Sequence, residues 1–596
     1  MRSITRLTAL GLAGLALAAC GHKDENAPLA FAPADTPYVL ANLAVLDDDT
    51  RAALLAQADT QLPSQLAQLN AVADQMAPKD ADGARLLHAL AAEFNGKTVA
   101  TFAQTAGLDL KGYSALYGIG LSPVLRMALS DPKAFDGFIG RLETAYGKKL
   151  DVANVGAQSY RKYTFAASGT QAILAMVGKQ AVLSLLPADA SSALLRQALG
   201  LDRPQKNLQD DGRLKTLAKA KGYQDWLVGN IDMTLALPAA VGGNDPLFSA
   251  IIKAHATTES AKTGEPVANQ LQTSPSCAPE ASRIAARIPA VSFGYTQLDA
   301  THQEVRFDIG LANDISQAFA DLKVELPGLG SPGTAPFDVS MALPVAQLRT
   351  FWSAQSEAVA AKPFTCPALV DLNDGFAKLG AAVQKAAIPP FGDMLGLRIA
   401  LDSLKSVKNA TIPSFTGRVV LATSNPTGLL AMSQMMVPAL AQLKLSPNAP
   451  PQALPKDMVS MLGQPAFIAL GEKDVAIGIG AGEDAQLSDT LKAATGEAGG
   501  IGRMHLSGSM YMTWLQLMEE KSDSLSTAAA TLDKNDDPSI DGGDSVNDPA
   551  QIAANAARSK AQFAAMKAQA ARVDHIDAEA HIDSEGLVVT SRTLLK

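Results

Sequence analysis

The last strand-like segment of the sequence holds the densest set of side chains that could bind a metal ion. Two histidines and three carboxylates recur at every second position: His575, Asp577, Glu579, His581 and Asp583. Apolar residues fill the positions between them, so a β-strand would place all five on one face. Imidazole and carboxylate groups bind divalent metals, which makes His575 and His581 candidate ligands. The same alternation is typical of the water-facing side of an antiparallel sheet, and we favour that interpretation.

An acidic stretch before this segment could form a calcium loop. Its oxygen-bearing side chains occupy positions 1, 3, 5, 9 and 12 of a twelve-residue loop: Asp533, Asn535, Asp537, Asp541 and Asp544. This spacing resembles that of an EF-hand loop. Pro538 stands where such a loop needs glycine, and Asp544 is shorter than the usual bidentate glutamate. We therefore favour a plain acidic loop, keep calcium as the alternative, and expect no other cofactor.

Three methionines, Met432, Met435 and Met436, recur at helical spacing just before Pro438. Methionine at this spacing most often fills a core, although thioethers also suit copper(I) or a pliable apolar ligand site. The chain lacks the Gly-x-Ser-x-Gly and His-Glu-x-x-His motifs and a phosphate-binding glycine loop. We therefore expect a protein that is not an enzyme and name no catalytic residue.

The N-terminus has the features of an export signal. Arg2 and Arg6 precede a short apolar run, which Leu17-Ala-Ala-Cys20 closes. This segment resembles a bacterial lipoprotein signal with its lipobox. The resemblance implies that residues 1–19 are removed, that Cys20 carries the lipid, and that residues 20–33 form a tether. It further implies attachment to the periplasmic face of the outer membrane, because no aspartate follows Cys20 directly. An ordinary signal peptide is the alternative.

The charge balance argues against a nucleic-acid partner. The chain has 50 Lys and Arg against 59 Asp and Glu, a formal net charge of −9, whereas nucleic-acid binders carry a basic patch. No stretch after Cys20 approaches the roughly 18 consecutive apolar residues of a membrane-spanning helix. The lipid on Cys20 is therefore the expected membrane attachment.

Two further cysteines, Cys277 and Cys366, remain in the sequence. In the oxidising periplasm, two thiols that can meet usually form a disulfide, and we expect this pair to do so. Free structural cysteines are the alternative.

A long internal repeat indicates the fold. Ser130-Asp-Pro132 returns as Ser424-Asn-Pro426, in each case after an apolar run and before an amphipathic helix. Two apolar runs follow in both copies, at 172–186 and 466–479, and their nearly continuous apolar character predicts strands buried on both faces. A repeat of this length is a domain duplication. We expect an α+β fold of two duplicated halves, each an antiparallel sheet packed with helices.

The expected boundaries follow from the repeat and from composition. The first repeat covers 34–325, a glycine- and proline-rich linker covers 326–334, and the second repeat covers 335–596. An acidic insertion interrupts the second repeat at about 519–549.

The start of the folded part, Ala34-Asp-Thr-Pro-Tyr-Val39, resembles that of uncharacterised proteobacterial lipoproteins, for which no activity is implied. We expect a lipid-anchored periplasmic envelope protein with a non-enzymatic binding or scaffolding role, whose partners are the membrane and other envelope proteins. One alternative is a carrier of an apolar ligand or lipid between the two halves. Another is a hydrolase with an unrecognised active site.

Overall fold

The computed structural model describes residues 26–263, 273–331, 333–386, 388–405, 413–460, 463–532 and 549–596. The chain divides into two compact units. Unit 1 comprises Met1–Leu311 together with Thr365–Val370, and unit 2 comprises Ala312–Phe364 and Asp371–Lys596. Both units combine helices with antiparallel strands, which confirms the expected α+β class.

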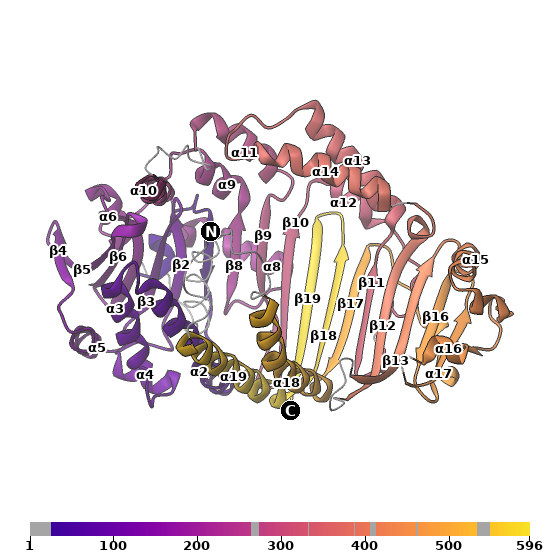
Figure 1. The fold of residues 1–596 in the computed structure, drawn as a ribbon. Helices are drawn as coiled ribbons and strands as arrows, with labels where there is room; N and C mark the ends of the chain where they lie inside the picture. The colour runs from indigo at the N-terminus through magenta and orange to yellow at the C-terminus, as the bar shows by residue number, and fades with distance from the viewer. Residues whose placement is uncertain are drawn as a thin grey trace. The chain divides into compact units, whose positions relative to one another are not determined.

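Unit 1 is built on an antiparallel sheet (Figure 1). Its strands lie in the order β4-β5-β6-β7-β3-β2-β1-β8-β9-β10. Their bounds are β1 Tyr38–Ala41, β2 Ser114–Ile119, β3 Ser122–Ala128, β4 Asp151–Val155, β5 Gln158–Phe165, β6 Thr170–Val177, β7 Gln180–Pro187, β8 Val228–Asp232, β9 Ala290–Leu298 and β10 His302–Gly310.

The helices of unit 1 connect these strands and cover parts of the sheet. Their bounds are η1 Pro28–Phe31, α2 Asp48–Met76, α3 Ala81–Ala92, α4 Val99–Thr105, α5 Pro132–Tyr146, η2 Ala166–Ser168, α6 Ser192–Leu199, α7 Leu208–Asp211, α8 Arg213–Lys221, α9 Met233–Val241, α10 Pro246–Thr263, η3 Pro275–Cys277 and α11 Ala278–Ala285. Residues of η1, α6, α7 and α8 form one core with the inward side chains of β1, β2, β3, β6 and β7. The Asp131 carboxylate accepts hydrogen bonds from the first turn of α5, which begins at Pro132 as expected.

The expectation that the run 172–186 is buried on both faces is wrong. Ile173 and Val182 are fully buried on the face that the core covers, whereas Leu183 is 42% exposed and Met176 is also exposed. Successive residues of a strand point to opposite faces, and the second face is covered only in part: Ala181 is buried in a core with residues of α4 and α5, whereas Leu183 is not. A continuous apolar run therefore does not require two covered faces.

The strands of unit 2 also pair in antiparallel fashion, in the order β14-β15-β16-β13-β12-β11-β17-β18-β19. The strand bounds are β11 Phe337–Ala342, β12 Met394–Lys405, β13 Ser414–Thr423, β14 Gln452–Ala453, β15 Ala466–Leu470, β16 Asp474–Ile479, β17 Gly500–Ser507, β18 Val573–Ile582 and β19 Gly586–Leu595. The helix bounds are α12 Asn313–Ala320, α13 Val345–Ala361, α14 Asp371–Ala386, η4 Phe391–Asp393, α15 Pro426–Met436, η5 Pro438–Gln442, α16 Lys456–Val459, α17 Glu483–Leu491, α18 Gly508–Leu532 and α19 Pro549–Arg572.

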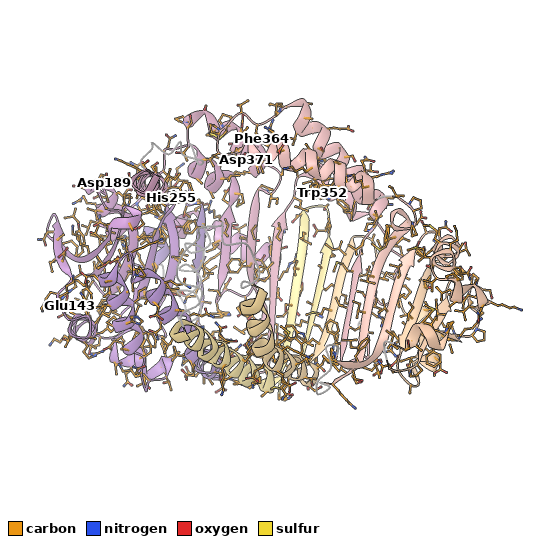
Figure 2. The ribbon with its side chains drawn as sticks, viewed as in Figure 1. Glu143, Asp189, His255, Trp352, Phe364 and Asp371 are labelled. Atoms are coloured by element: carbon orange, nitrogen blue, oxygen red, sulfur yellow. A yellow bond between two sulfur atoms is a disulfide. The ribbon has the colours of Figure 1, made fainter. Side chains whose placement is uncertain are left out.

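Helices α13 and α14 pack mainly against each other. Neither helix has a fully buried residue among those whose burial is described. Trp352 on α13 contacts Phe351, with ring centroids 5.1 Å apart (Figure 2). The connection between the two helices, Thr365–Val370, belongs to unit 1. Its neighbours in the chain, Phe364 and Asp371, are labelled in Figure 2.

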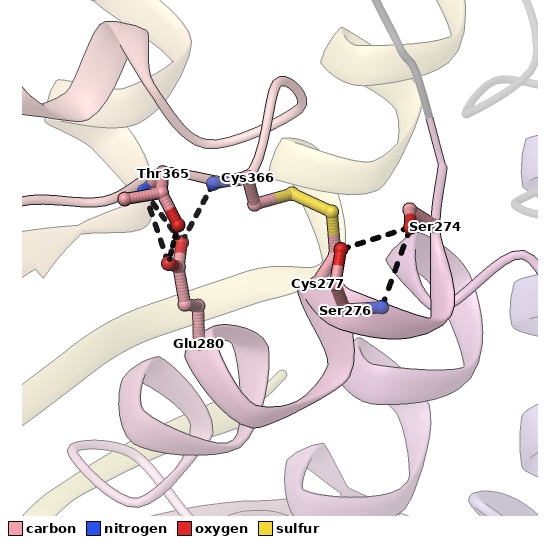
Figure 3. The surroundings of a disulfide bond; sticks show 6 residues. All are labelled: Ser274, Ser276, Cys277, Glu280, Thr365 and Cys366. Carbon is pink, nitrogen blue, oxygen red and sulfur yellow. Dashed lines mark hydrogen bonds between the residues drawn. A yellow bond between two sulfur atoms is a disulfide. The ribbon is translucent and has the colours of Figure 1, made fainter.

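A disulfide joins Cys277 to Cys366, which confirms the expected pair (Figure 3). Beside it, the Glu280 carboxylate accepts hydrogen bonds from the backbone N–H of Thr365 at 3.0 Å and from that of Cys366 at 3.0 Å. The Thr365 hydroxyl donates to the same carboxylate at 2.6 Å. Although partial burial acts to raise it, these hydrogen bonds lower the pKa of Glu280 below its ordinary value.

One stretch among the described residues, Met233–Thr257, is long and apolar enough by length and composition to cross a membrane, with a mean hydropathy of 1.3. It is formed by two helices, α9 and α10, because the chain turns between them at Gly243, whose φ is +70°. Helix α9 packs on α11, and α10 packs on β6 and β7. These contacts join both helices to unit 1, and 28% of the apolar stretch is buried.

We expect Cys277→Ser to abolish the disulfide and to destabilise unit 1, because the bond closes a loop of 89 residues in the sequence. Loop closure over this length contributes about 4 kcal/mol to the free energy of unfolding in the chain-entropy model. The measurements are mobility on reducing and non-reducing gels and denaturant unfolding. Ser276→Ala is the control, and equal mobility of the oxidised and reduced wild-type protein would contradict the bond.

Candidate functional site: the apolar face of unit 2

The strand register of unit 2 collects large apolar side chains on one face of its sheet. Paired residues in an antiparallel ladder point to the same face. Three rows cross β16, β13, β12, β11 and β17: Val475, Leu421, Leu397 and Met341; then Ile477, Val419, Ile399, Val339 and Met504; then Ile479, Leu401, Phe337 and Leu506. We call this set the apolar face. No charged residue occurs in its rows.

The apolar face is only partly covered by protein. Each of its side chains is partly exposed, and Met341, on β11 in the first row, is 50% exposed. On the opposite face of the same strands, Ala400, Val420 and Ala476 are fully buried. Large aliphatic residues are usually among the most completely buried in a protein, so a face of this size without full cover is a candidate binding surface.

The opposite, covered face contains a buried ion pair. Arg398 on β12 donates to both carboxylate oxygens of Asp338 on β11, at 2.9 and 2.6 Å, and to the Pro327 carbonyl at 3.4 Å. The segment expected to be a linker packs over this pair, with Leu326 and Leu329 buried. A Cβ on Gly333 would fall 1.6 Å from an Asp338 oxygen, so only glycine allows this close approach.

A second cluster of charged side chains lies at the start of α17, with Arg418 and Glu483 buried and Asp402 partly exposed. The Arg418 guanidinium is 2.9 Å from an Asp402 oxygen and 3.3 Å from an oxygen of Glu483. Burial raises the pKa of Glu483 to about 7; Arg418 opposes this rise, and the neighbouring Asp402 carboxylate adds to it. Burial also raises the pKa of Asp474 to about 6, with a contribution from Glu472. These groups lie on or beside the covered face, and burial brings their pKa values closer to neutral pH than those of ordinary carboxyl groups.

The structure does not bring the two candidate metal ligands together. His575 and His581 stand six positions apart on β18, roughly 20 Å along a strand. His575 instead lies beside His505 of β17, and Asp577 contacts both, at 3.3 and 2.8 Å. Among the described residues, no group of three or more His, Cys, Asp or Glu side chains is arranged to hold a metal ion.

Sequence reasoning missed His505, because its approach to His575 depends on the pairing of two strands far apart in the chain. A search for a second histidine at an alternating position of another expected strand could have found it.

Other expected sites fall outside the part of the chain that the structure describes. These are the calcium-loop residues Asp533, Asn535, Asp537, Asp541 and Asp544, and the lipid-bearing Cys20. The region expected to be an acidic insertion begins within a helix, because α18 continues to Leu532.

The methionines of α15 do not fill a core, which corrects the favoured interpretation of their spacing. Met435 and Met436 are among the most exposed apolar residues described, and Met432 is also exposed. Helical spacing specifies that side chains share a face, but it does not specify whether another element covers that face.

With this geometry established, the chain was compared with known protein families, curated proteins and solved structures, and no match was found in any of the three comparisons.

We expect Glu483→Gln to make stability less dependent on pH. A carboxyl whose pKa is raised in the folded state stabilises the protein below its unfolded pKa, and this contribution is lost as pH rises through the folded value. For Glu483, this contribution to stability is lost between about pH 4.5, which is the ordinary pKa of the side chain, and about pH 7, its pKa in the folded protein. Glutamine mimics the protonated side chain, so the variant should be more stable than the wild type at pH 8.

Denaturant midpoints between pH 5 and 8 measure this effect, with the exposed Asp484→Asn as the control. Parallel pH profiles for the wild type and Glu483→Gln would contradict the assignment.

Proposed function

We propose that the protein is a lipid-anchored periplasmic envelope protein with a non-enzymatic binding role, and that it binds acyl chains on the apolar face of unit 2. The proposal is based on the contrast between the two faces of the sheet. The apolar face is uncharged and partly exposed, whereas residues of the opposite, covered face are fully buried. Its rows span about 19 Å across the strands and about 13 Å along them, from the ordinary spacings of a sheet.

The chemistry of the face favours acyl chains over a protein partner. Protein interfaces carry about one hydrogen bond per 100–200 Å² and are enriched in tyrosine, tryptophan and arginine. The three rows contain aliphatic residues, two methionines and one phenylalanine, without a side-chain hydrogen-bonding group. Methionine adapts its shape to irregular apolar ligands. A flexible hydrocarbon chain is therefore the ligand class that fits best.

We also infer that the two units arose by duplication. The order β5-β6-β7-β3-β2-β1-β8-β9-β10 of unit 1 corresponds strand by strand to the order of unit 2, which supports the inference. The matching helix starts at Asp131-Pro132 and Asn425-Pro426 support it as well. In this interpretation, unit 2 is a copy whose sheet became open to ligand.

The proposed location depends on Cys20 and its resemblance to a lipobox cysteine. The outer membrane remains the proposed destination, with the lipid as the attachment. We expect Cys20→Ala to abolish incorporation of labelled palmitate, because the acylated side chain is then absent. Cys277→Ser is the matched control and should retain the label. Equal labelling of the Cys20→Ala protein would contradict the anchor.

We expect Met341→Asp to weaken acyl-chain binding about 10-fold or more, because a carboxylate in the first row of the face would lose its hydration under a bound chain. Met341 is already half exposed, so the free protein should tolerate the change. The measurement is titration with a fluorescent fatty acid. Val152→Asp, at an exposed position in unit 1, is the charge-matched control. Wild-type protein that does not bind the probe would refute the proposed ligand class.

A further inference from the structure

The most exposed apolar side chains of the described residues come mainly from two short segments of unit 2. Met435 is 84% exposed, Met436 81%, Phe391 68% and Ile388 62%; of the other large apolar residues described, only Val152 exceeds 60%. Met432 and Val437 are exposed beside them. Isolated exposed apolar residues are normal, but this concentration indicates a contact surface.

These two segments meet at one end of the β12–β13 hairpin. Phe391 opens η4 just before β12, and α15 follows directly after β13. The backbone N–H of Ser424 donates to the Asp393 carbonyl at 2.9 Å, which joins the segments before α15 begins. We call this surface the apolar tip and define it as Ile388, Phe391, Met432, Met435, Met436 and Val437.

The corresponding helix of unit 1 is covered by its own chain. In α5, which also follows the third strand of its sheet, Phe138 and Leu142 are buried, and α3 and α4 pack against this helix. In α15 the buried residue is Pro426 at its first position. Helices α13 and α14 follow β11 as α2 and α3 follow β1, but they pack on each other instead of on α15. Among the described residues, α13 packs against η4 and η5 packs against α15, yet Met435, Met436 and Phe391 remain more than 60% exposed.

The charge pattern indicates what covers the tip. Asp and Glu make up 59 of the 596 residues, yet none occurs among the thirty residues from Pro426 to Pro455, where Lys444 is the one charged residue. On the other segment, Lys385 precedes Ile388 and Asp393 follows Phe391, so the charges there are mixed. The apolar side chains of α15, in a segment with a lysine and without acidic residues, match the acyl chains and anionic headgroups of a lipid surface.

We propose that the apolar tip is a docking site for the surface of a lipid bilayer. The side chains project from a helix end and a short turn, and methionine, phenylalanine and isoleucine can enter the acyl region without leaving polar groups unpaired. The first row of the apolar face lies near this end of the strands. Met394 and Thr423 form the pair at the end of the β12–β13 ladder, and the pair of Leu397 and Leu421 lies close to it. A lipid could pass from the tip to that row only if the proposed function, acyl-chain binding on the apolar face, is correct. Docking of the tip on a bilayer does not depend on that function.

The test is flotation of the mature chain from Gly21 onward, without the lipid, on vesicles of phosphatidylethanolamine and phosphatidylglycerol. The wild type should float with the vesicles. Met435→Asp with Met436→Asp should lower the bound fraction at least ~10-fold, since burial of either methionine contributes more than one tenfold step in partitioning. Val152→Asp with Met176→Asp adds the same charge at exposed positions of unit 1 and should float as the wild type does.

Wild-type protein that stays at the bottom of the gradient overturns the proposal and points to a protein partner at the tip. Equal flotation of the tip variant overturns it as well. Thermal unfolding of the tip variant should match the wild type, because both methionines are exposed in the folded protein. Fluorescent fatty-acid binding is measured separately, without vesicles. If the protein floats with vesicles but does not bind the fatty acid, the proposed function is refuted and the docking site stands.

Discussion

The buried pair between Arg398 and Asp338 is the constraint on which the architecture of unit 2 depends. A guanidinium and a carboxylate that leave water need hydrogen bonds and close cover, and removal of either partner would leave a charge unpaired inside the protein. The segment around Pro327, with its glycines, supplies that cover. Strand residues alternate between the two faces of a sheet. Because this segment covers the face that holds Arg398 and Asp338, the large apolar residues lie on the other face, which is less covered.

Unit 1 meets a similar constraint with a different set of partners. Arg126 is fully buried on the covered face, where its guanidinium donates to the Tyr117 hydroxyl, the Gln180 amide oxygen and the Ala198 carbonyl. It also lies over the Phe31 ring, 4.0 Å from the centroid. In both units, a buried arginine on the covered face coincides with close packing there, so the surfaces left for binding are those that the helices do not reach.

Local sequence signals predicted where helices and strands form, but not which of their faces are covered by other parts of the protein. Asp131-Pro132 correctly placed the start of a helix, and the two cysteines after Cys20 correctly indicated a disulfide, because capping and thiol oxidation depend on residue type. The exposure of Met435 and of Leu183 on β7 could not be predicted, because an apolar pattern reveals which residues share a face and not what packs against it. The meeting of His505 with His575 required the register of strands separated by two long helices.

The path of the chain through Thr365–Val370 limits how the molecule can be divided. A fragment that ends at Leu311 would include nearly all of unit 1 but would carry Cys277 without Cys366. In an oxidising compartment, such a fragment would expose a reactive thiol and cross-link to a second copy. The separable module of this protein is therefore discontinuous in sequence, and a faithful unit 1 has to bring the short cysteine-bearing segment with it as a covalently attached peptide.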